Sequence, residues 1–345
     1  MMKINNKILF IVKNKNEASS RFRVFSYLNH LEQDFEVSFF YAEYKNTKVP
    51  KMLRSLVKRF RFITLVNLVR KNDIIFMQRP MSVDGNKSTF FEWLFTRFNK
   101  NLIFDYDDAI FVENATKMKS LVSLSKACIC GNDYLADFAK QYNPNTYIIP
   151  TPIDTDKFIS TKAVTGESIT IGWTGTSGNY AYFTTEMIQD IKDVLLKYSH
   201  VNFLFICDRR PNEKFDFPYT FIRWNDETEV NDLKKIDIGL MPLIDSPWTR
   251  GKCGFKLIQY GSISIPSIAS DVGVNAEVVL DGKSGYLVQN GQSDWKKYLE
   301  ILIHDPQLRE SMGKIAREHI ENVYSVNKNY PKLKVVLENL IKPAV

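Results

Sequence analysis

The sequence predicts an α/β protein that consists of two doubly wound domains, each built around a parallel sheet. Short apolar runs recur along the chain, and such runs are typical of strands that are buried on both faces of a sheet. Stretches with apolar residues at helical spacing lie between these runs. The alternation stops once, from Pro150 to Ser168, and then starts again, which predicts a linker between two similar domains.

In the first half of the chain, six buried strands alternate with helices. The strands are expected at 7–12, 36–41, 73–78, 101–105, 127–130 and 146–149. The helices are expected at 21–31, 51–70, 88–98 and 133–142. Ser19 or Ser20, at the end of a polar loop, is expected to cap the first of these helices. These elements predict a Rossmann-like domain over residues 1–150.

The second half repeats this alternation after a linker at 151–168. Strands are expected at 169–173, 201–207, 219–223, 238–241 and 267–270. Helices are expected at 184–198, 226–234, 293–302, 306–324 and 330–341. A second Rossmann-like domain is therefore expected over residues 169–325.

The composition indicates a folded protein that stays in the cytoplasm. The chain has 345 residues, 44% of them hydrophobic, which is enough for two cores. Its four cysteines form no C-x-x-C pair, which favours reduced thiols over a zinc site or a disulfide framework. The first residues have neither the apolar core nor the cleavage site of a secretory leader, and no stretch reaches transmembrane length.

Basic residues are concentrated in one segment, 48–71. Eight lysines and arginines lie there without an acidic residue, while the whole chain has a net charge of +7. Its apolar residues recur at helical spacing, which predicts a basic amphipathic helix on an anionic membrane surface. A packing helix with a solvated basic face is the alternative. No nucleic-acid partner is expected, because the segment contains no recognised binding motif.

A glycine-containing loop enters a helix near residue 254 and is a candidate anion site. Backbone N–H groups in the first turn of a helix have no partner within the helix, and the helix dipole is positive there. A diphosphate can therefore dock at Gly254 and Phe255, with Lys252 and Lys256 supplying charge. Many helix N-termini bind nothing, but this loop follows the strand at 238–241, and open α/β sheets bind ligands at strand ends.

Several short motifs, taken in their order along the chain, resemble landmarks of the family 4 glycosyltransferases, which have the GT-B fold. They are SSRFR at 19–23, QRP at 78–80, FDYDDAIF at 104–111, GN at 131–132, PTPID at 150–154, IGWTG at 171–175, DIGLMP at 237–242, GKCGFKLIQY at 251–260 and GVNAE at 273–277. No single motif is diagnostic. Their order covers nearly the whole chain and is similar to that of glycosyl transferases group 1.

This resemblance implies two Rossmann-like domains that face a cleft, with a C-terminal helix at 326–345 returning to the N-terminal domain. It implies that the C-terminal domain holds a nucleotide-sugar donor and that the N-terminal domain holds the acceptor, a cell-surface glycan or a lipid-linked intermediate. Family members retain the anomeric configuration and generally need no metal, so no cofactor is expected. A role in polysaccharide biosynthesis follows, at the inner face of the cell membrane.

The resemblance also assigns the residues that would hold the diphosphate. Thr174 and Gly175 would approach it with their backbone, and Lys252, Lys256 and the amides near Gly254 would neutralise it. Positive charge there stabilises the transition state, because the departing diphosphate gains charge as the glycosidic bond breaks. The turn after the strand at 169–173 lacks basic residues, so the two lysines are expected to supply this charge.

Two further donor contacts follow from the resemblance. Glu277 would lie near the donor sugar, with a simple helix-start acid as the alternative. Trp224 would stack on the donor base, with a core tryptophan as the alternative.

The sequence departs from the family pattern at two positions. Family members commonly have two glutamates eight residues apart, and Gly251 and Gln259 occupy these places here. Gln259 is expected to bind ribose hydroxyls without charge, while Asp245 or Asn275 takes over selection of the sugar. The missing glutamates also leave open a protein of another class, a catalytically inactive GT-B module that binds a partner.

Three aspartates, Asp105, Asp107 and Asp108, lie at the end of the strand at 101–105. Asp107 or Asp108 is expected to orient or deprotonate the acceptor hydroxyl, with helix capping as the alternative. A D-x-D pair such as Asp105 and Asp107 can also bind Mg²⁺ or Mn²⁺. A metal-dependent glycosyltransferase is less favoured, because it leaves the second α/β domain without a purpose.

Basic and hydroxyl side chains at neighbouring positions are candidates for the acceptor. Ser20, Arg21, Arg23 and Arg79 lie in strand-end loops or in the first helical turn, where they can contact an acceptor phosphate. Solvated surface arginines are the alternative.

Overall fold

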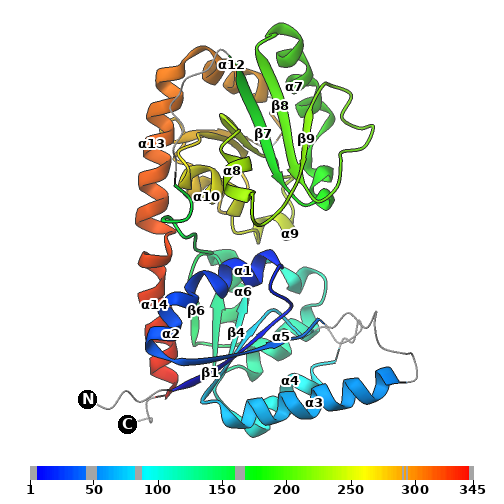
Figure 1. Cartoon of the computed structure of the whole chain (residues 1–345), viewed down its shortest axis with the longest axis vertical. Helices are drawn as coiled ribbons and strands as arrows, with labels where there is room; N and C mark the ends of the chain where they lie inside the picture. The colour runs from blue at the N-terminus through cyan, green and yellow to red at the C-terminus, as the bar shows by residue number, and fades with distance from the viewer. Residues whose placement is uncertain are drawn as a thin grey trace. The chain divides into compact units, whose positions relative to one another are not determined.

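The computed structural model describes residues 6–43, 53–81, 88–159, 168–289, 291–292 and 294–341. The chain forms two compact units, which we call unit 1 (Met1–Pro152 with Asn329–Val345) and unit 2 (Ile153–Lys328). Both are visible in Figure 1. The predicted linker begins at 151, whereas unit 2 already begins at Ile153; residues 160–167 lie outside the described residues.

Unit 1 is built on a six-stranded parallel sheet in the order β2-β1-β3-β4-β5-β6. The strands are β1 (Lys7–Val12), β2 (Glu36–Tyr41), β3 (Ile74–Gln78), β4 (Leu102–Tyr106), β5 (Ala127–Cys130) and β6 (Thr146–Ile148). Every residue of β3, β4 and β5 is buried, because helices cover both faces of a sheet of this kind. All six strands were predicted from the apolar runs.

Helices and short 3-10 turns connect these strands. They are α1 (Ala18–Arg23), η1 (Phe25–Tyr27), α2 (Leu28–Asp34), α3 (Arg54–Lys71), α4 (Phe90–Phe98), η4 (Ile110–Val112), α5 (Ala115–Leu124) and α6 (Asp133–Lys140). Helices α3, α4 and α5 pack side by side, as Figure 1 shows for α3 and α4. The final helix, α14 (Val326–Ile341), contacts α2, where the Tyr330 hydroxyl donates to the carboxylate of Asp34 at 2.7 Å.

Two predictions for unit 1 are wrong. The helix expected at 21–31 is broken into α1, η1 and α2, and neither serine caps it: Glu17 stands at the N-cap, while Ser19 and Ser20 are buried inside α1. Their small side chains pack inward at positions where a cap would point to solvent. Helix α5 was not predicted, although Asn114 caps it by accepting a hydrogen bond from the backbone N–H of Lys117.

Unit 2 has a second six-stranded parallel sheet, in the order β12-β11-β10-β7-β8-β9. Its strands are β7 (Ile169–Gly175), β8 (Val201–Cys207), β9 (Thr220–Arg223), β10 (Ile238–Met241), β11 (Ser267–Ser270) and β12 (Gly285–Val288). Strand β12 was not predicted. Its four residues are too few for a clear pattern, and Gly285 lies so close to Ser267 that a Cβ there would come within 2.2 Å of the Ser267 carbonyl oxygen.

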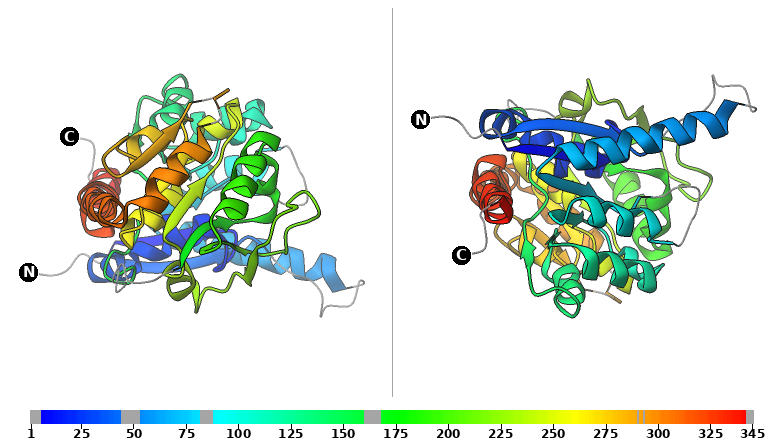
Figure 2. Two further views of the ribbon diagram at one scale, coloured as in Figure 1. Left: turned by 90° about the horizontal axis from the view of Figure 1, so that it is seen from above. Right: turned by 90° about the horizontal axis from the view of Figure 1, so that it is seen from below.

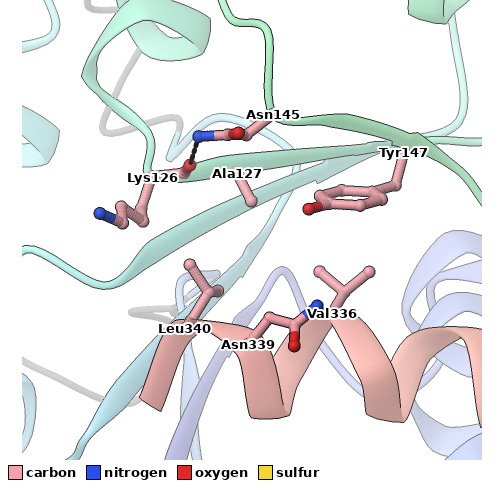
Figure 3. A pocket seen from close by; sticks show the side chains of 7 residues that line it. All are labelled: Lys126, Ala127, Asn145, Tyr147, Val336, Asn339 and Leu340. Carbon is pink, nitrogen blue, oxygen red and sulfur yellow. Dashed lines mark hydrogen bonds between the residues drawn. The ribbon is translucent and has the colours of Figure 1, made fainter. Parts of the chain in front are cut away.

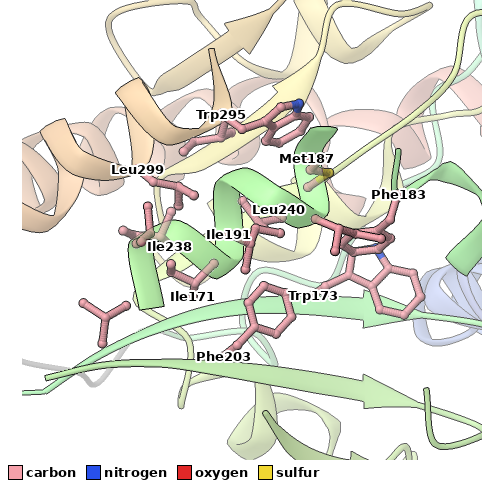
Figure 4. Close-up of a cluster of buried hydrophobic side chains, with 14 of the residues drawn as sticks. Ile171, Trp173, Phe183, Met187, Ile191, Phe203, Ile238, Leu240, Trp295 and Leu299 are labelled. Carbon is pink, nitrogen blue, oxygen red and sulfur yellow. The ribbon is translucent and has the colours of Figure 1, made fainter. Parts of the chain in front are cut away.

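Helices and one 3-10 segment connect or follow the strands of unit 2. They are η5 (Ser177–Tyr182), α7 (Thr185–Lys197), α8 (Glu229–Leu233), α9 (Pro247–Arg250), α10 (Phe255–Ser262), α11 (Asn275–Val278), α12 (Trp295–His304) and α13 (Pro306–Val323). Helices α7 and α12 pack together, and α10 packs against α13. Figure 4 shows a core cluster of this unit, in which Trp173, Phe203 and Ile238 of the sheet meet Ile191 of α7 and Leu299 of α12.

The predicted fold class, two doubly wound parallel sheets, is confirmed. Cys128, Cys130 and Cys207 are buried and Cys253 is half-buried, all as free thiols. In the part of the chain that the structure describes, no helix combines the length and the hydropathy that a membrane span requires.

Candidate functional site

The strand order of unit 2 reverses between β7 and β10. Strands β8 and β9 follow β7 on one side, whereas β10, β11 and β12 lie on its other side. Open parallel sheets bind ligands at the carboxyl ends of their strands, at such a reversal point. The predicted diphosphate residues Thr174 and Gly175 are the last two residues of β7. Lys252 lies between α9 and α10 in the segment that follows β10, and Lys256 is in α10.

Lys256 lies directly on the end of β7. A Cβ on Gly175 would come within 2.7 Å of the Lys256 Cε atom and within 2.7 Å of the Trp173 ring, so only glycine leaves room for this stem. The Lys256 ammonium group is 5.7 Å from the centre of the Trp173 ring. The structure therefore brings together Gly175 and Lys256, two residues that the resemblance assigns to the same diphosphate.

Tyr260 connects α10 to two strands of the sheet. Its hydroxyl accepts a hydrogen bond from the backbone N–H of Thr174 at 3.0 Å and donates to the carbonyl of Leu240 at 3.3 Å. Its ring packs on Gly239, where a Cβ would come within 2.4 Å of a ring carbon. Burial raises the pKa of the Tyr260 hydroxyl, so it remains a donor at neutral pH. These contacts fix the position of α10, which carries Lys256, relative to the end of β7.

Gly254 begins α10 in the left-handed conformation, with φ of 64°. This conformation favours glycine, and a Cβ would also come within 3.0 Å of Val278 in α11. Asn275, predicted as a donor contact, is buried under this turn, and its side-chain amide donates to the carbonyl of Ser270 at 2.9 Å. Phe255 is half-buried at the first position of the helix.

Lys252 lies near two aromatic rings, one from η5 and one from α9. Its ammonium group is 5.8 Å from the centre of the Tyr182 ring and 5.9 Å from that of Trp248. Asp245, considered for sugar selection, accepts two hydrogen bonds of 2.7 Å from Arg250. The hydrogen bonds from Arg250 lower the pKa of Asp245.

Trp224 and Gln259 meet at a residue that the sequence analysis did not single out. The indole N–H of Trp224 donates to Glu229 Oε1 at 3.1 Å, and the Gln259 amide donates to the same oxygen at 3.0 Å. Glu229 and Gln259 are buried, whereas Trp224 is half-buried. In the sequence, Glu229 is only an acid at the start of a short helix. The ribose contact of Gln259 and the stacking of Trp224 stay predictions.

Glu277 is exposed on α11, and its backbone carbonyl lies 2.8 Å from Nε2 of His319 in α13. Its contact with a donor sugar stays a prediction.

The strand order of unit 1 also reverses, between β1 and β3. Glu17 follows β1 and Arg79 follows β3, and their side chains form an ion pair at 3.8 Å. The predicted acceptor residue Arg79 therefore lies at the reversal point of its own sheet.

Arg79 also pairs with the two aspartates that were predicted to act on the acceptor. Its Nε donates to Asp107 at 3.0 Å, and a terminal nitrogen pairs with Asp108. Arg79 has φ of 64°, a conformation that costs a non-glycine residue free energy and is often found at functional sites. Burial acts to raise the pKa of Asp107, but the charges of Arg79 and Arg23 outweigh it and lower that pKa. Asp107 is therefore ionised at neutral pH.

Arg23 and Ser20 lie deeper than expected. Arg23 is 3% exposed, forms a two-pronged ion pair with Asp105, and donates to the carbonyl of Ile149 at 2.6 Å. The alternative of a solvated surface arginine is therefore wrong for Arg23. Ser20 is fully buried, and its hydroxyl has no hydrogen-bond partner among the described residues. Arg21 is half-buried, with its guanidinium 4.7 Å from the ring of Phe22.

The two carboxylates of the alternative cation site are engaged by arginines, Asp105 by Arg23 and Asp107 by Arg79. Among the described residues, no group of three or more His, Cys, Asp and Glu side chains is placed to hold a metal ion.

A small cavity of about 180 Å³ lies elsewhere in unit 1, between the sheet and α14 (Figure 3). Its lining comprises Lys126, Ala127, Asn145, Tyr147, Val336, Asn339 and Leu340. Lys126 and Asn145 directly precede β5 and β6, so this cavity is at the amino ends of the strands, away from the reversal point.

Two sheets of this order define the class of the protein, which is the GT-B fold. Sucrose-phosphate synthase from Thermosynechococcus elongatus superimposes with a TM-score of 0.76 at 13% identity, over 97% of this chain and 99% of that chain. Anabaena Alr3699/HepE in complex with UDP and glucose superimposes with a TM-score of 0.72 at 13% identity, over 97% and 100% of the two chains.

A family model matches a segment of unit 2. Residues 219–319 match the family model "Glycosyl transferases group 1", which confirms the resemblance predicted from the motifs. The capsular polysaccharide biosynthesis glycosyltransferase CapM of Staphylococcus aureus is 26% identical over 164 residues, which are 46% of this chain and 43% of CapM. The chain spans less than half the length of the curated relatives it matches. The matched segment contains α10, Lys252 and Trp224.

Proposed function

We propose that the protein is a glycosyltransferase that moves a sugar from a nucleotide-sugar donor to a glycan or lipid-linked acceptor. One observation carries this proposal: Gly175 and Lys256 meet at the reversal point of unit 2, inside a GT-B fold whose segment 219–319 matches the group 1 family. HepE, which has the same fold, is described in complex with UDP and glucose. A UDP-sugar is therefore the first donor to test.

Unit 2 would act on the leaving group. As the bond between the sugar C1 and the diphosphate oxygen breaks, the electron pair leaves with the diphosphate. Lys252 and Lys256 would stabilise this growing negative charge, together with the positive end of the α10 dipole at Gly254. Tyr260 would act only by holding α10 in place.

Unit 1 would act on the acceptor. The acceptor oxygen forms the new bond to C1, and its proton must leave. Asp107 is ionised and can accept a proton, but its lowered pKa makes it a weak base. We therefore propose that Asp107 and Asp108, with Arg79, mainly orient the acceptor hydroxyl.

The finer parts of the proposal come from the resemblance. They are retention of the anomeric configuration, transfer without a metal ion, a cell-surface polysaccharide as the product, and action on the cytoplasmic side of the membrane. Contact with an anionic membrane through residues 48–71 belongs to the same proposal, and residues 48–52 of this segment lie outside the described residues.

The test is donor turnover. The protein is incubated with a panel of nucleotide sugars with and without EDTA, and release of the nucleoside diphosphate is measured. Slow hydrolysis of one donor is expected, with an apparent KM that rises about tenfold or more in Lys256→Ala. The control is Lys314→Ala on α13, which removes the same charge from an exposed position.

If the protein neither hydrolyses nor binds any donor of the panel, the result would contradict the proposed glycosyltransferase activity and favour a catalytically inactive GT-B module. The carboxylates are tested separately with Asp107→Asn and Asp108→Asn. If both variants transfer sugar within a few-fold of the wild-type rate, neither aspartate has the proposed role.

A further inference from the structure

We infer that the outer faces of α3 and α4 form one surface that docks on an anionic lipid bilayer, with apolar side chains entering the lipid. This surface, which we call the α3–α4 surface, consists of Leu53, Leu56, Phe60 and Ile63 at α3 and of Phe90 and Trp93 on α4. The inference deepens the proposed membrane contact. It rests on no step of sugar transfer, so a failure of either proposal leaves the other testable.

The first part of the surface is an apolar stripe along α3. Leu53, Leu56, Phe60 and Ile63 follow one another at steps of three and four residues, which places them on one side of the helix. They are 46%, 50%, 62% and 56% exposed. Large apolar residues in such a contiguous exposed row mark an interaction surface rather than ordinary surface composition.

The stripe points away from the side of α3 that packs on unit 1. Leu65 and Val69, at most 1% exposed, hold the helix to the unit. Leu65 is two residues beyond Ile63, which is about 200° around the helix. Figure 2 shows the N-terminal half of α3 extending away from the sheet of unit 1.

Helix α4 adds aromatic residues next to this stripe. Phe62 of α3 contacts Phe91 of α4 with ring centres 5.3 Å apart, and Phe91 and Trp93 both contact Phe90, at 5.7 and 6.0 Å. Phe90 is 53% and Trp93 43% exposed. Tryptophan is favoured at the boundary between lipid and water because its ring is apolar and its N–H is polar.

The charge around the surface is of one sign. Arg59, Arg70 and Lys71 lie on the same side of α3 as the apolar stripe, and α3 contains no acidic residue. Arg97 of α4 lies 5.5 Å from the centre of the Trp93 ring. An apolar stripe bordered by basic side chains is the pattern of a helix that lies in the interface of an anionic membrane.

This combination favours lipid over other occupants. A symmetric dimer through the same surface would place two copies of the basic helix α3 against each other, where their positive charges would repel. A nucleic acid would pair with the basic residues but would leave the apolar stripe in water. An anionic bilayer can bury the apolar stripe in lipid and pair the basic side chains with anionic head groups at the same time.

The test uses the full-length protein and two kinds of vesicle, one of phosphatidylcholine alone and one that also contains about 30% phosphatidylserine. In flotation, binding is expected to the anionic vesicles only, and to weaken as added salt shortens the Debye length from about 10 Å at 0.1 M to about 3 Å at 1 M. Trp93 is the exposed tryptophan among the five, so a blue shift of emission should accompany binding and should be lost in Trp93→Phe.

Two sets of variants separate charge from insertion. Arg59→Ser, Arg70→Ser and Lys71→Ser together should weaken binding more than about tenfold, because each basic group near anionic lipid contributes about fivefold. The matched control replaces Lys140, Lys283 and Lys332, which are exposed on other elements. Phe60→Ser with Ile63→Ser should also weaken binding at least about tenfold, with Leu196→Ser and Val335→Ser, 74% and 54% exposed, as the control.

Three results would overturn the inference. One is equal binding to neutral and anionic vesicles. Another is unchanged binding in either α3 variant. The third is concentration-dependent self-association that Phe60→Ser with Ile63→Ser abolishes while no variant affects vesicles, which would make the surface a contact between copies of the chain.

Discussion

Replacing Asp105 with alanine should destabilise unit 1 while leaving unit 2 intact. Asp105 is 1% exposed and pairs through both oxygens with Arg23, which is itself 3% exposed. In Asp105→Ala the guanidinium loses both oxygens of its buried carboxylate partner, and it cannot lose its proton. Breaking a buried ion pair in this way costs about 3–5 kcal/mol. With a urea m-value of about 2 kcal/mol per M, the unfolding midpoint should fall by about 1.5–2.5 M.

The assay is urea titration followed by hydrogen exchange and mass spectrometry, which reads peptides of each unit separately. Peptides from β4 and β5 should lose protection at lower urea, and peptides from β8 should not. The control removes both charges, as Arg23→Met with Asp105→Leu. Because no buried charge is then left alone, it should cost much less than the single replacement.

A fall of less than about 0.5 M in the midpoint, equivalent to about 1 kcal/mol, would refute this reasoning. So would a double variant that is as unstable as Asp105→Ala. Either result would mean that the ion pair of Arg23 contributes little to the stability of unit 1. It would strengthen the prediction that Arg23 contacts the acceptor.

Three further predictions concern the two reversal points. Gly175→Ala should raise the apparent donor KM several-fold, because its methyl group would displace the Lys256 stem; an unchanged KM in donor-hydrolysis kinetics would remove Gly175 from the site. Gly239→Ala should lower the free energy of unfolding of unit 2 by about 1–3 kcal/mol through a clash with the ring of Tyr260, and a urea midpoint equal to wild type would contradict this packing. Arg79→Met should change the acid sensitivity of unit 1. The folded pKa of Asp107 is lowered, so its contribution to stability is present above the unfolded value of about 3.9 and is lost as pH falls through the folded value. Urea midpoints between pH 6 and pH 3 should therefore fall less steeply in this variant, and an equally steep fall would show that Arg79 does not lower that pKa.

Much of the fold was predictable because buried parallel strands leave a local signal. Residues 8–12 and 203–207 form uninterrupted apolar runs, since helices cover both faces of the sheet. Helix α5 and strand β12 were missed. Four residues of β12 are too few to show a period, and the strand exists because Gly285 allows close approach to β11.

For the candidate donor site, the sequence predicted a loop followed by a helix but not the tertiary contacts of its residues. Lys252, Gly254 and Lys256 are neighbours in sequence, so their spacing alone indicated an anion site. That Gly175 receives the Lys256 stem could not be read from the sequence, because 80 residues separate these positions and only the packing of α10 on the sheet brings them together.

The roles of the charged residues were decided by tertiary structure. The sequence by itself determined two α/β domains, a basic segment at 48–71, and a glycine and lysine loop at a strand end. It did not distinguish Arg23, which is buried against Asp105, from Arg79, which lies between Asp107 and Asp108 at the reversal point. It also gave no sign that Glu229 accepts hydrogen bonds from both Trp224 and Gln259. The physical reason is that a charged residue looks the same in sequence whether it is solvated or paired, and the partner that decides this is far away along the chain.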